Sequence, residues 1–148
     1  MKIISTAFKP GEAIPSKYSK DGKNVNPPLH IEDVPAKARS LALVVDDPDA
    51  PSGTFNHWVL FNMDPKIQDI HEDSTPVWAT RGQNDFGQTQ YDGPQPPSGT
   101  HHYHFKLFAL DEMLNLQPGV RRADLEKAMR GHVVEEADLT AVYSRNQA

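Results

Sequence analysis

The sequence predicts an all-β-dominated chain folded as an antiparallel β-sandwich, with long proline-rich loops and one or two short helices. The clearest apolar runs are short and rich in β-branched or aromatic residues, which is typical of strands. Thirteen prolines outnumber nine glycines, and aliphatic and aromatic residues punctuate the proline-rich segments, which indicates stiff, ordered loops. One segment has helical periodicity, so a βαβ fold is not favoured.

The N-terminal third is expected to contain a short edge strand at residues 2–8 and then mostly loop over residues 12–36. The run Ser40 to Asp46 is apolar almost throughout, which favours a central strand covered on both faces. His57 to Met63 is predicted to form the next strand. Simple alternation then points Trp58 to the face opposite His57.

Residues 64–98 are expected to be mainly loop, with a short strand around Pro76 to Ala79. His101 to Leu110 is the third clear strand. Its alternation places His101 and Tyr103 on the face that continues into the core. His102 and His104 belong to the other face.

A helix is predicted over about Arg121 to Arg130. Leu125, Ala128 and Met129 give it an apolar stripe, and Gly131 provides a stop. Ala137 to Ser144 alternates as a strand and closes the fold.

Composition excludes several classes of function. Residues 1–148 are expected to form a single domain with no membrane span, because no window reaches the roughly 18 apolar residues that a spanning helix needs. The first ten residues lack a secretory apolar region, which predicts a cytoplasmic protein. The net charge of −5, with basic residues scattered, argues against nucleic-acid binding. The absence of cysteine excludes disulfides and thiol chemistry.

Two proline-locked segments carry most of the chemical information. Residues 46–51 (Asp-Asp-Pro-Asp-Ala-Pro) precede His57-Trp58, and residues 93–103 (Gly-Pro-Gln-Pro-Pro-Ser-Gly-Thr-His-His-Tyr) enter the third strand. Each stiff, polar turn leads into a buried strand, which suits a small pocket whose side chains are held still before a ligand arrives. Ala50-Pro51 and Pro96-Pro97 are candidates for cis peptide bonds.

Local sequence leaves the roles of the acidic and imidazole groups open. Asp47 and Asp49 either orient histidines and ligand or cap backbone amides in an Asx turn. His57 is either a structural strand-end histidine or the partner of Asp47, ten residues away. His102 and His104 share a face, yet no metal-binding frame surrounds them, so we expect neither a metal nor another cofactor.

The two segments, taken with residues 18–29 and 82–87 (Gly-Gln-Asn-Asp-Phe-Gly), resemble the phosphatidylethanolamine-binding protein family, also called Raf kinase inhibitor-like proteins. The likeness is to the short bacterial and archaeal branch and covers nearly the whole chain. It implies an antiparallel sandwich with a small surface pocket that binds anions, including phosphate and phosphorylated head groups. By position, the pocket residues implied by the resemblance are Asp47, Asp49, His57, Pro96, Pro97, Gly99, His101 and Tyr103.

Two departures from the family pattern matter. His102 stands where the family often has arginine, but on a face that leaves the pocket intact. The chain also ends soon after its last strand, without the long C-terminal helix that borders the pocket in eukaryotic relatives. We therefore expect a more open site.

The sequence thus predicts a non-enzymatic protein that binds a small anion or phospho-ligand, with a regulatory role in phospho-signalling as an option. In this hypothesis the two aspartates hold His57 and His101 as donors, and backbone amides of residues 97–100 add further donors. Replacing His57 by alanine should then lower affinity with little loss of fold. The alternatives are a hydrolase that uses Asp and His as acid and base in the same pocket, and a module that recognises phosphorylated protein segments. A homodimer is expected from the resemblance.

Overall fold

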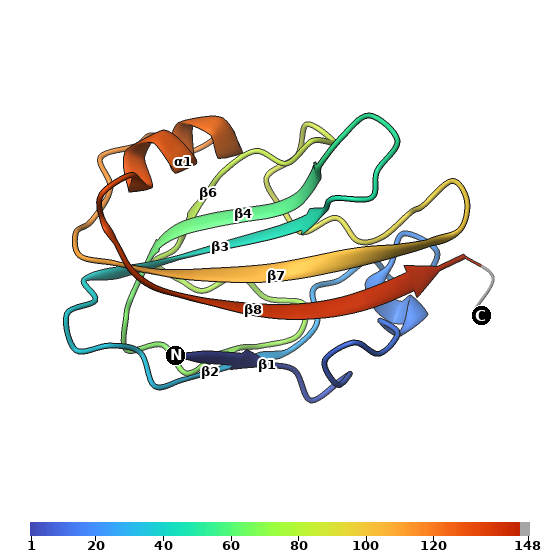
Figure 1. Cartoon of the computed structure of the whole chain (residues 1–148), viewed down its shortest axis with the longest axis horizontal. Helices are drawn as coiled ribbons and strands as arrows, with labels where there is room; N and C mark the ends of the chain where they lie inside the picture. Colours follow the sequence, from blue (N-terminus) through green and yellow to red (C-terminus); the bar gives the residue numbers. More distant parts are fainter. Residues whose placement is uncertain (146–148) are drawn as a thin grey trace.

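A five-stranded antiparallel sheet with strand order β6-β4-β3-β7-β8 forms the centre of the structure (Figure 1). The computed structural model describes residues 1–145. The strands of this sheet are β3 (Ser40–Asp47), β4 (Phe55–Met63), β6 (Thr80–Arg81), β7 (Thr100–Leu110) and β8 (Val133–Ser144). The longest pairing joins β7 to β8 along the whole length of β7.

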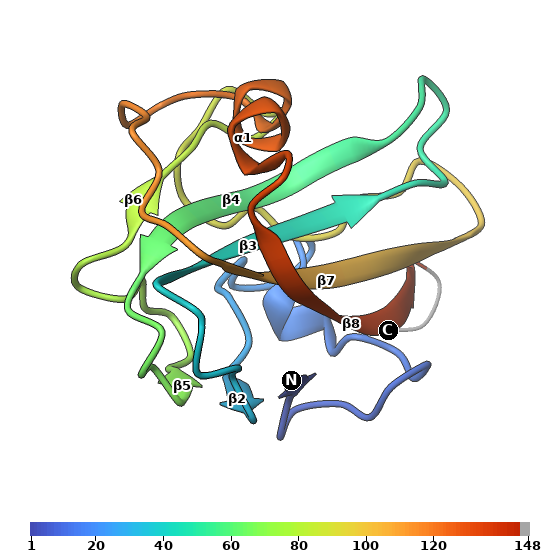
Figure 2. The ribbon, with the colours of Figure 1, turned by 60° about the vertical axis from the view of Figure 1, so that its left-hand side comes forward.

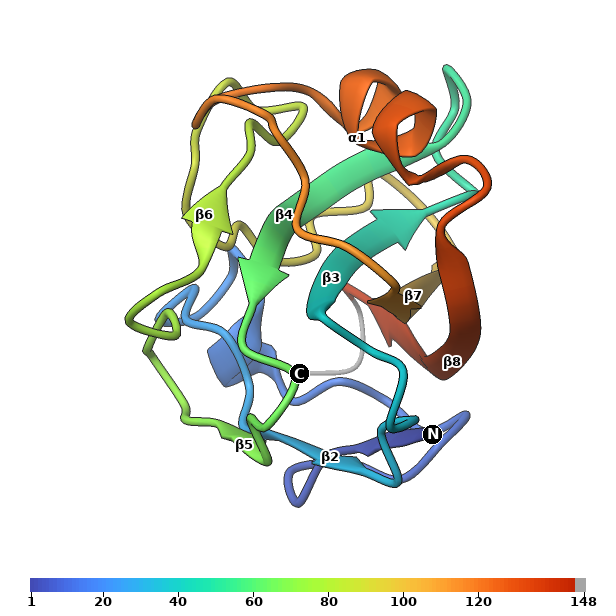
Figure 3. The ribbon, with the colours of Figure 1, turned by 90° about the vertical axis from the view of Figure 1, so that its left-hand side faces the viewer.

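A smaller antiparallel sheet, ordered β1-β2-β5, packs on one face of the large one, and helix α1 covers part of the other face (Figure 3). Its strands are β1 (Lys2–Ile4), β2 (Leu29–Glu32) and β5 (Asp69–Ile70), and α1 spans Arg122–Met129. A short 3₁₀ helix, η1 (Ser16–Tyr18), precedes β2. The antiparallel sandwich predicted from the sequence is therefore confirmed.

Strand β3 shows why the large sheet is stable. All eight of its residues are buried, as expected for a strand covered on both faces. Leu43 and Val45 face the core between the two sheets, whereas Val44 faces the apolar cluster under α1. Helix α1 contributes Leu125 and Met129 to that cluster, so its predicted apolar stripe is confirmed. Over residues 1–145, no helix is long and apolar enough to cross a bilayer.

Several local expectations were wrong. The edge strand expected at residues 2–8 ends at Ile4, because Ser5 Oγ accepts a hydrogen bond from the Ala7 amide and donates to the Pro28 carbonyl, which turns the chain. The strand expected around Pro76 to Ala79 is a turn closed by a hydrogen bond between the Ala79 amide and the Pro76 carbonyl. The adjacent β6 is two residues long.

Strand β2 was missed because it is only four residues long and directly follows Pro27-Pro28. Strand β8 begins at Val133 rather than Ala137. Its first four residues do not alternate between buried and exposed, so they give no strand signal, and pairing with β7 defines them.

Asp46 anchors α1 to the outer face of the large sheet. Its carboxylate is fully buried and is paired with the Arg122 guanidinium and, at 3.2 Å, with Lys106 Nζ. The same Arg122 nitrogen donates to Asn56 Oδ1 at 2.9 Å. One helix residue therefore ties together two neighbouring strands.

Removing this carboxylate should destabilise the fold. Asp46→Ala leaves two partly exposed cations without their partner, and we expect a loss of about 2 kcal/mol, below the cost for a fully buried pair because both cations can rehydrate. Urea denaturation would measure it, with Glu136→Ala, an exposed carboxylate on β8, as a surface control. A loss no larger than that of the control would show that the ion pairs do not hold the helix.

Candidate functional site

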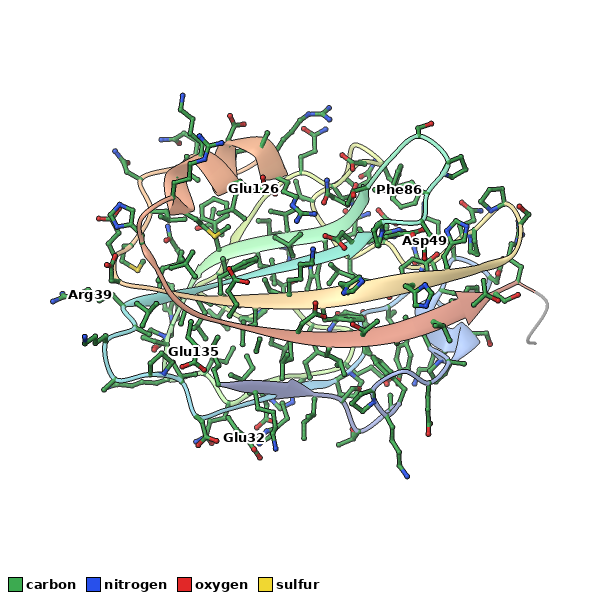
Figure 4. The ribbon with its side chains drawn as sticks, in the orientation of Figure 1. Glu32, Arg39, Asp49, Phe86, Glu126 and Glu135 are labelled. Atoms are coloured by element: carbon green, nitrogen blue, oxygen red, sulfur yellow. The ribbon has the colours of Figure 1, made fainter. Side chains whose placement is uncertain are left out.

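The two proline-rich segments meet at one end of the sandwich, where they enclose a cavity of about 390 Å³. Its walls are residues 50–55, Phe86 and residues 95–97. Figures 1 and 2 both show the β3–β4 connection and the loop before β7 projecting from the same end of the large sheet. Asp49 and Phe86 lie toward that end, whereas Arg39 lies at the opposite one (Figure 4).

The floor of the cavity is made by Asp47, His57, His101 and Tyr103. Asp47 closes β3, and the register of β3 with β7 places it on the same face as Tyr103. The alternation argument for β7 was therefore right: His101 and Tyr103 are 8% and 1% exposed and both lie on the inner face.

A β-bulge brings His57 to this floor. Val45 pairs with Trp58, but Asp46 pairs with Asn56, so His57 is an extra residue between them. The His57 ring packs edge-on against Tyr103 with centroids 5.3 Å apart, and Trp58 packs against Tyr91 in the same core. The expectation that His57 and Trp58 lie on opposite faces was wrong, because the bulge interrupts the alternation.

Asp47 and His101 form the closest polar contact of the cavity. His101 Nδ1 lies 2.6 Å from Asp47 Oδ2, and both side chains are almost completely buried. The other carboxylate oxygen accepts the Asp49 amide at 2.8 Å, the Asx-turn bond that was one of the two alternatives for this residue. Asp47 thus combines the two roles: it caps the turn and orients the imidazole.

The second imidazole is held by backbone rather than by an aspartate. His57 Nδ1 lies 2.7 Å from the carbonyl oxygen of Asp92. Because a carbonyl can only accept, Nδ1 carries the proton. Burial lowers the pKa of His57, and the Asp92 carbonyl and the charge of Asp47 only partly oppose this effect. His57 is therefore neutral near neutral pH, with an unprotonated Nε2.

Tyr103 presents a buried hydroxyl with no hydrogen-bond partner among residues 1–145. Burial raises the pKa of this phenol, and the negative charge of Asp47 and the interaction of the phenol with the Asp47 side chain raise it further. The group is therefore a neutral hydroxyl that lies close to Asp47 and can donate to a ligand bound beside it. A buried hydroxyl without a partner is costly, and a ligand in the cavity would remove that cost.

Two of the expected site residues do not line the cavity. The Asp49 carboxylate points to His102, whose amide and Nδ1 lie 2.8 and 2.7 Å from it, and these bonds lower the pKa of Asp49. Gly99 has a left-handed φ of 72° and serves the turn before β7. Residues 98–100 lie outside the lining, so the amides expected to contact an anion are not part of the wall.

The lining residues Pro96 and Pro97 are where the sequence placed them. The Ala50-Pro51 and Pro96-Pro97 bonds are both trans, since residues 1–145 contain no cis peptide bond. His102 and His104 pair with separate carboxylates, and the described residues contain no group of three or more metal-binding side chains.

Sequence reasoning missed the segment that holds the far wall. Asn84 Oδ1 accepts the amides of Phe86 and Gln88, and its Nδ2 donates to Asp92 Oδ2 at 2.9 Å. This loop places Phe86 edge-on to His57, with centroids 5.5 Å apart. Residues 82–87 are the sequence signal for this wall. They support the family resemblance, but the local sequence assigns them no role in the pocket.

Lys20 was also missed. Its ammonium lies 3.6 Å from the centroid of Phe86 and 3.6 Å from Asp92 Oδ1. Lys20 therefore supports the Phe86 wall from the side that faces away from the cavity. Nothing in the sequence near Lys20 marks this role, because Phe86 and Asp92 lie far from Lys20 along the chain.

Comparison with known proteins places the chain in a family. The model of the family described as phosphatidylethanolamine-binding protein matches residues 4–144. The chain belongs to the phosphatidylethanolamine-binding protein family. The resemblance drawn from the two proline-locked segments is thus confirmed.

Relatives in this family align with almost the whole chain. A UPF0098 protein of Pyrococcus abyssi is 46% identical over 98% of this chain and 86% of its own length. A UPF0098 protein of Methanothermobacter thermautotrophicus is 45% identical over 98% of this chain and 99% of its own.

Solved structures of the phosphatidylethanolamine-binding protein family share the fold. A homologue from Chlamydia trachomatis has a TM-score of 0.94 and 37% identity, over 98% of this chain and 97% of its own. Escherichia coli YbcL, described as a member of the mammalian family, has a TM-score of 0.90 and 28% identity, over 97% of both chains. Family membership supports a ligand-binding protein in general.

Proposed function

We propose that this protein binds a small anion or phospho-ligand in the cavity floored by Asp47, His57, His101 and Tyr103. The observation that carries the proposal is the orientation of the two imidazoles. Each is held through Nδ1, by Asp47 and by the Asp92 carbonyl, and each lacks a partner for Nε2 among the described residues. Together with the Tyr103 hydroxyl they supply three groups that can donate to one oxyanion when both rings are protonated.

The walls strengthen these contacts. Pro51, Pro96, Pro97, Phe55 and Phe86 exclude water from one side of a ligand, and hydrogen bonds to charge are stronger where water is excluded. Proline also restricts φ, so less entropy is lost when the loops close on a ligand. The site is thus arranged before binding, as expected for a small-ligand pocket.

Calorimetric titration with inorganic phosphate at about pH 5.5 tests the proposal, because acid favours the protonated form of an imidazole that binds an anion. We expect His101→Ala and His57→Ala each to weaken binding by about 10-fold or more, the usual value of a hydrogen bond to a charged group. His132→Ala is the matched control: it also removes a histidine paired with a carboxylate, Asp111, outside the cavity. Equal affinity in all four proteins, or no binding to the unmodified chain, would contradict the proposal.

The sequence expectation that His57→Ala leaves the fold largely unaffected needs revision. His57 is 3% exposed, contacts three aromatic rings and bonds the Asp92 carbonyl. We expect this variant to lose about 2 kcal/mol of stability from the lost packing and hydrogen bond. Binding of each variant must therefore be compared below its own unfolding temperature.

The Asp47–His101 pair also favours the hydrolase alternative, because a carboxylate that orients an imidazole is a common general-base arrangement. Turnover of a phosphate or carboxyl ester that disappears in Asp47→Asn would support it. A role in phospho-signalling is a finer form of the binding proposal, in which the ligand phosphate is carried by a protein segment. Binding of a phosphopeptide but not of its unphosphorylated form would support that role.

A further inference from the structure

The floor of the cavity carries a hydrogen-bond acceptor that an anion must face. Asp47 is a buried carboxylate, and its protein partners are His101 Nδ1 on one oxygen and the Asp49 amide on the other. A carboxylate offers about four lone-pair positions, so two remain. These two positions can accept a hydrogen bond from a protonated ligand group, but they repel an unprotonated ligand oxygen.

His57 adds a second acceptor. Its Nδ1 proton is committed to the Asp92 carbonyl, so the neutral ring offers only a lone pair at Nε2. Burial keeps this ring neutral by lowering its pKa. Near neutral pH the floor therefore holds a carboxylate and an imidazole lone pair, with the Tyr103 hydroxyl as the neighbouring free donor.

No full positive charge from lysine or arginine offsets these acceptors, since none of the described residues that line the cavity is of either type. The titratable groups that face Asp47 are His101 and Tyr103 from β7 and His57 from β4. Behind His57, Lys20 Nζ lies 3.6 Å from Asp92 Oδ1 and over the Phe86 ring. The Lys20 ammonium therefore offsets the charge of Asp92 rather than that of Asp47.

We propose that the cavity selects oxyanions that still carry a proton, such as phosphate and its monoesters as monoanions, over fully ionised oxyanions such as sulfate. The physical reason is the contact with Asp47. A P–OH group donates to the carboxylate, and its remaining oxygens accept from Tyr103 and from the imidazoles once these are protonated. A sulfate oxygen in the same place sets two unprotonated, negatively charged oxygens side by side in a cavity with largely apolar walls. This inference rests on the proposed function and specifies its ligand class.

The test compares four probes by calorimetry with the whole protein: inorganic phosphate, methyl phosphate, dimethyl phosphate and sulfate. At about pH 5.5 the first two carry a P–OH proton, because the second pKa of a phosphate monoester is about 6 and that of inorganic phosphate is higher, whereas the diester and sulfate carry none. We expect phosphate and methyl phosphate to bind at least about 10-fold more tightly than dimethyl phosphate and sulfate. Methyl phosphate controls for the added methyl group.

Asp47→Asn gives the complementary result. The carboxamide has nearly the shape of the carboxylate but can donate to an oxyanion, so the preference for phosphate over sulfate should fall from about 10-fold to within about threefold. A preference unchanged in this variant overturns the inference. Thermal unfolding establishes that the variant is folded, and if it is not, the comparison of the four probes decides alone.

The outcomes separate this inference from the proposed function. Sulfate binding as tightly as phosphate to the unmodified protein would refute proton selection and leave the anion site standing. Failure of all four probes would refute the proposed function itself. Binding of methylammonium without any oxyanion would show that the acceptors of the floor recognise a cation, and both proposals would fall.

Discussion

Phosphate binding should weaken by about 10-fold or more between about pH 5.5 and pH 7.5, because each proton taken up on binding changes the affinity by up to about tenfold per pH unit. The sign follows from His57. In the free protein its pKa is lowered by burial, below the ordinary value of about 6.5. A bound anion favours the imidazolium, so it raises the pKa of His57 in the complex. Affinity is therefore greatest below the free-protein pKa and is lost as pH rises through the pKa of the complex.

Calorimetry in two buffers with different ionisation enthalpies measures this directly, because the difference between the observed enthalpies counts the protons taken up. We expect net uptake on binding. The His57→Ala variant should take up fewer protons than the unmodified chain, and the His132→Ala control should match it. Affinity that stays constant over this pH range would rule out a role for imidazole protonation.

The same titration has an opposite consequence for the fold. A histidine that is buried in its neutral form is protonated more readily when the chain unfolds, so stability falls as pH drops below the unfolded pKa of about 6.5. Acid therefore favours the ligand and weakens the free protein. Added phosphate should raise the unfolding temperature more at acid than at alkaline pH, which separates the two effects.

Replacing Gly93 by alanine should destabilise the protein by about 3 kcal/mol, at the upper end of the usual cost of overpacking. A Cβ atom at this position would lie 2.0 Å from the carbonyl oxygen of Tyr18 and 2.8 Å from Ser19 Cα. Both neighbours are backbone, and the Tyr18 carbonyl is also fixed by the Tyr91 hydroxyl at 2.7 Å. The chain around Gly93 would have to move.

This movement should also reach the cavity. Gly93 follows Asp92, whose carbonyl holds His57, so we expect Gly93→Ala to weaken phosphate binding as well as stability. Gly99→Ala is the matched control: it lies in the same loop, has open space around it, and should cost only about 1–2 kcal/mol for its left-handed φ. Urea denaturation compares the two variants. If Gly93→Ala were no less stable than Gly99→Ala, the close backbone contact would not be what requires glycine at position 93.

The β7 half of the site could be predicted from sequence because its geometry is local. Successive side chains of a strand point to opposite faces, so His101 and Tyr103 share a face wherever β7 pairs. The burial of Ser40–Asp47 on both faces was equally local, since a continuous apolar run has no polar side to expose. The two proline-rich segments were correctly placed at one cavity because each precedes or follows such a strand.

The rest depended on contacts between distant segments. The side on which His57 lies is set by a bulge, and a bulge exists only in relation to the partner strand β3. Asp49 turned toward His102 and away from the cavity, although it is only two residues from Asp47. Asp92 rather than an aspartate of the first motif fixes His57, because the loop held by Asn84 brings its carbonyl there.

The sequence by itself determined which residues form the central strands, which of them face inward, and which two stiff segments carry the polar groups. The tertiary structure alone decided which ring nitrogen each histidine presents to the cavity, and hence whether the floor accepts or donates hydrogen bonds. The physical reason is range. Alternation and proline restriction act within a few residues, whereas strand register and hydrogen-bond partners are fixed by segments that meet only after folding.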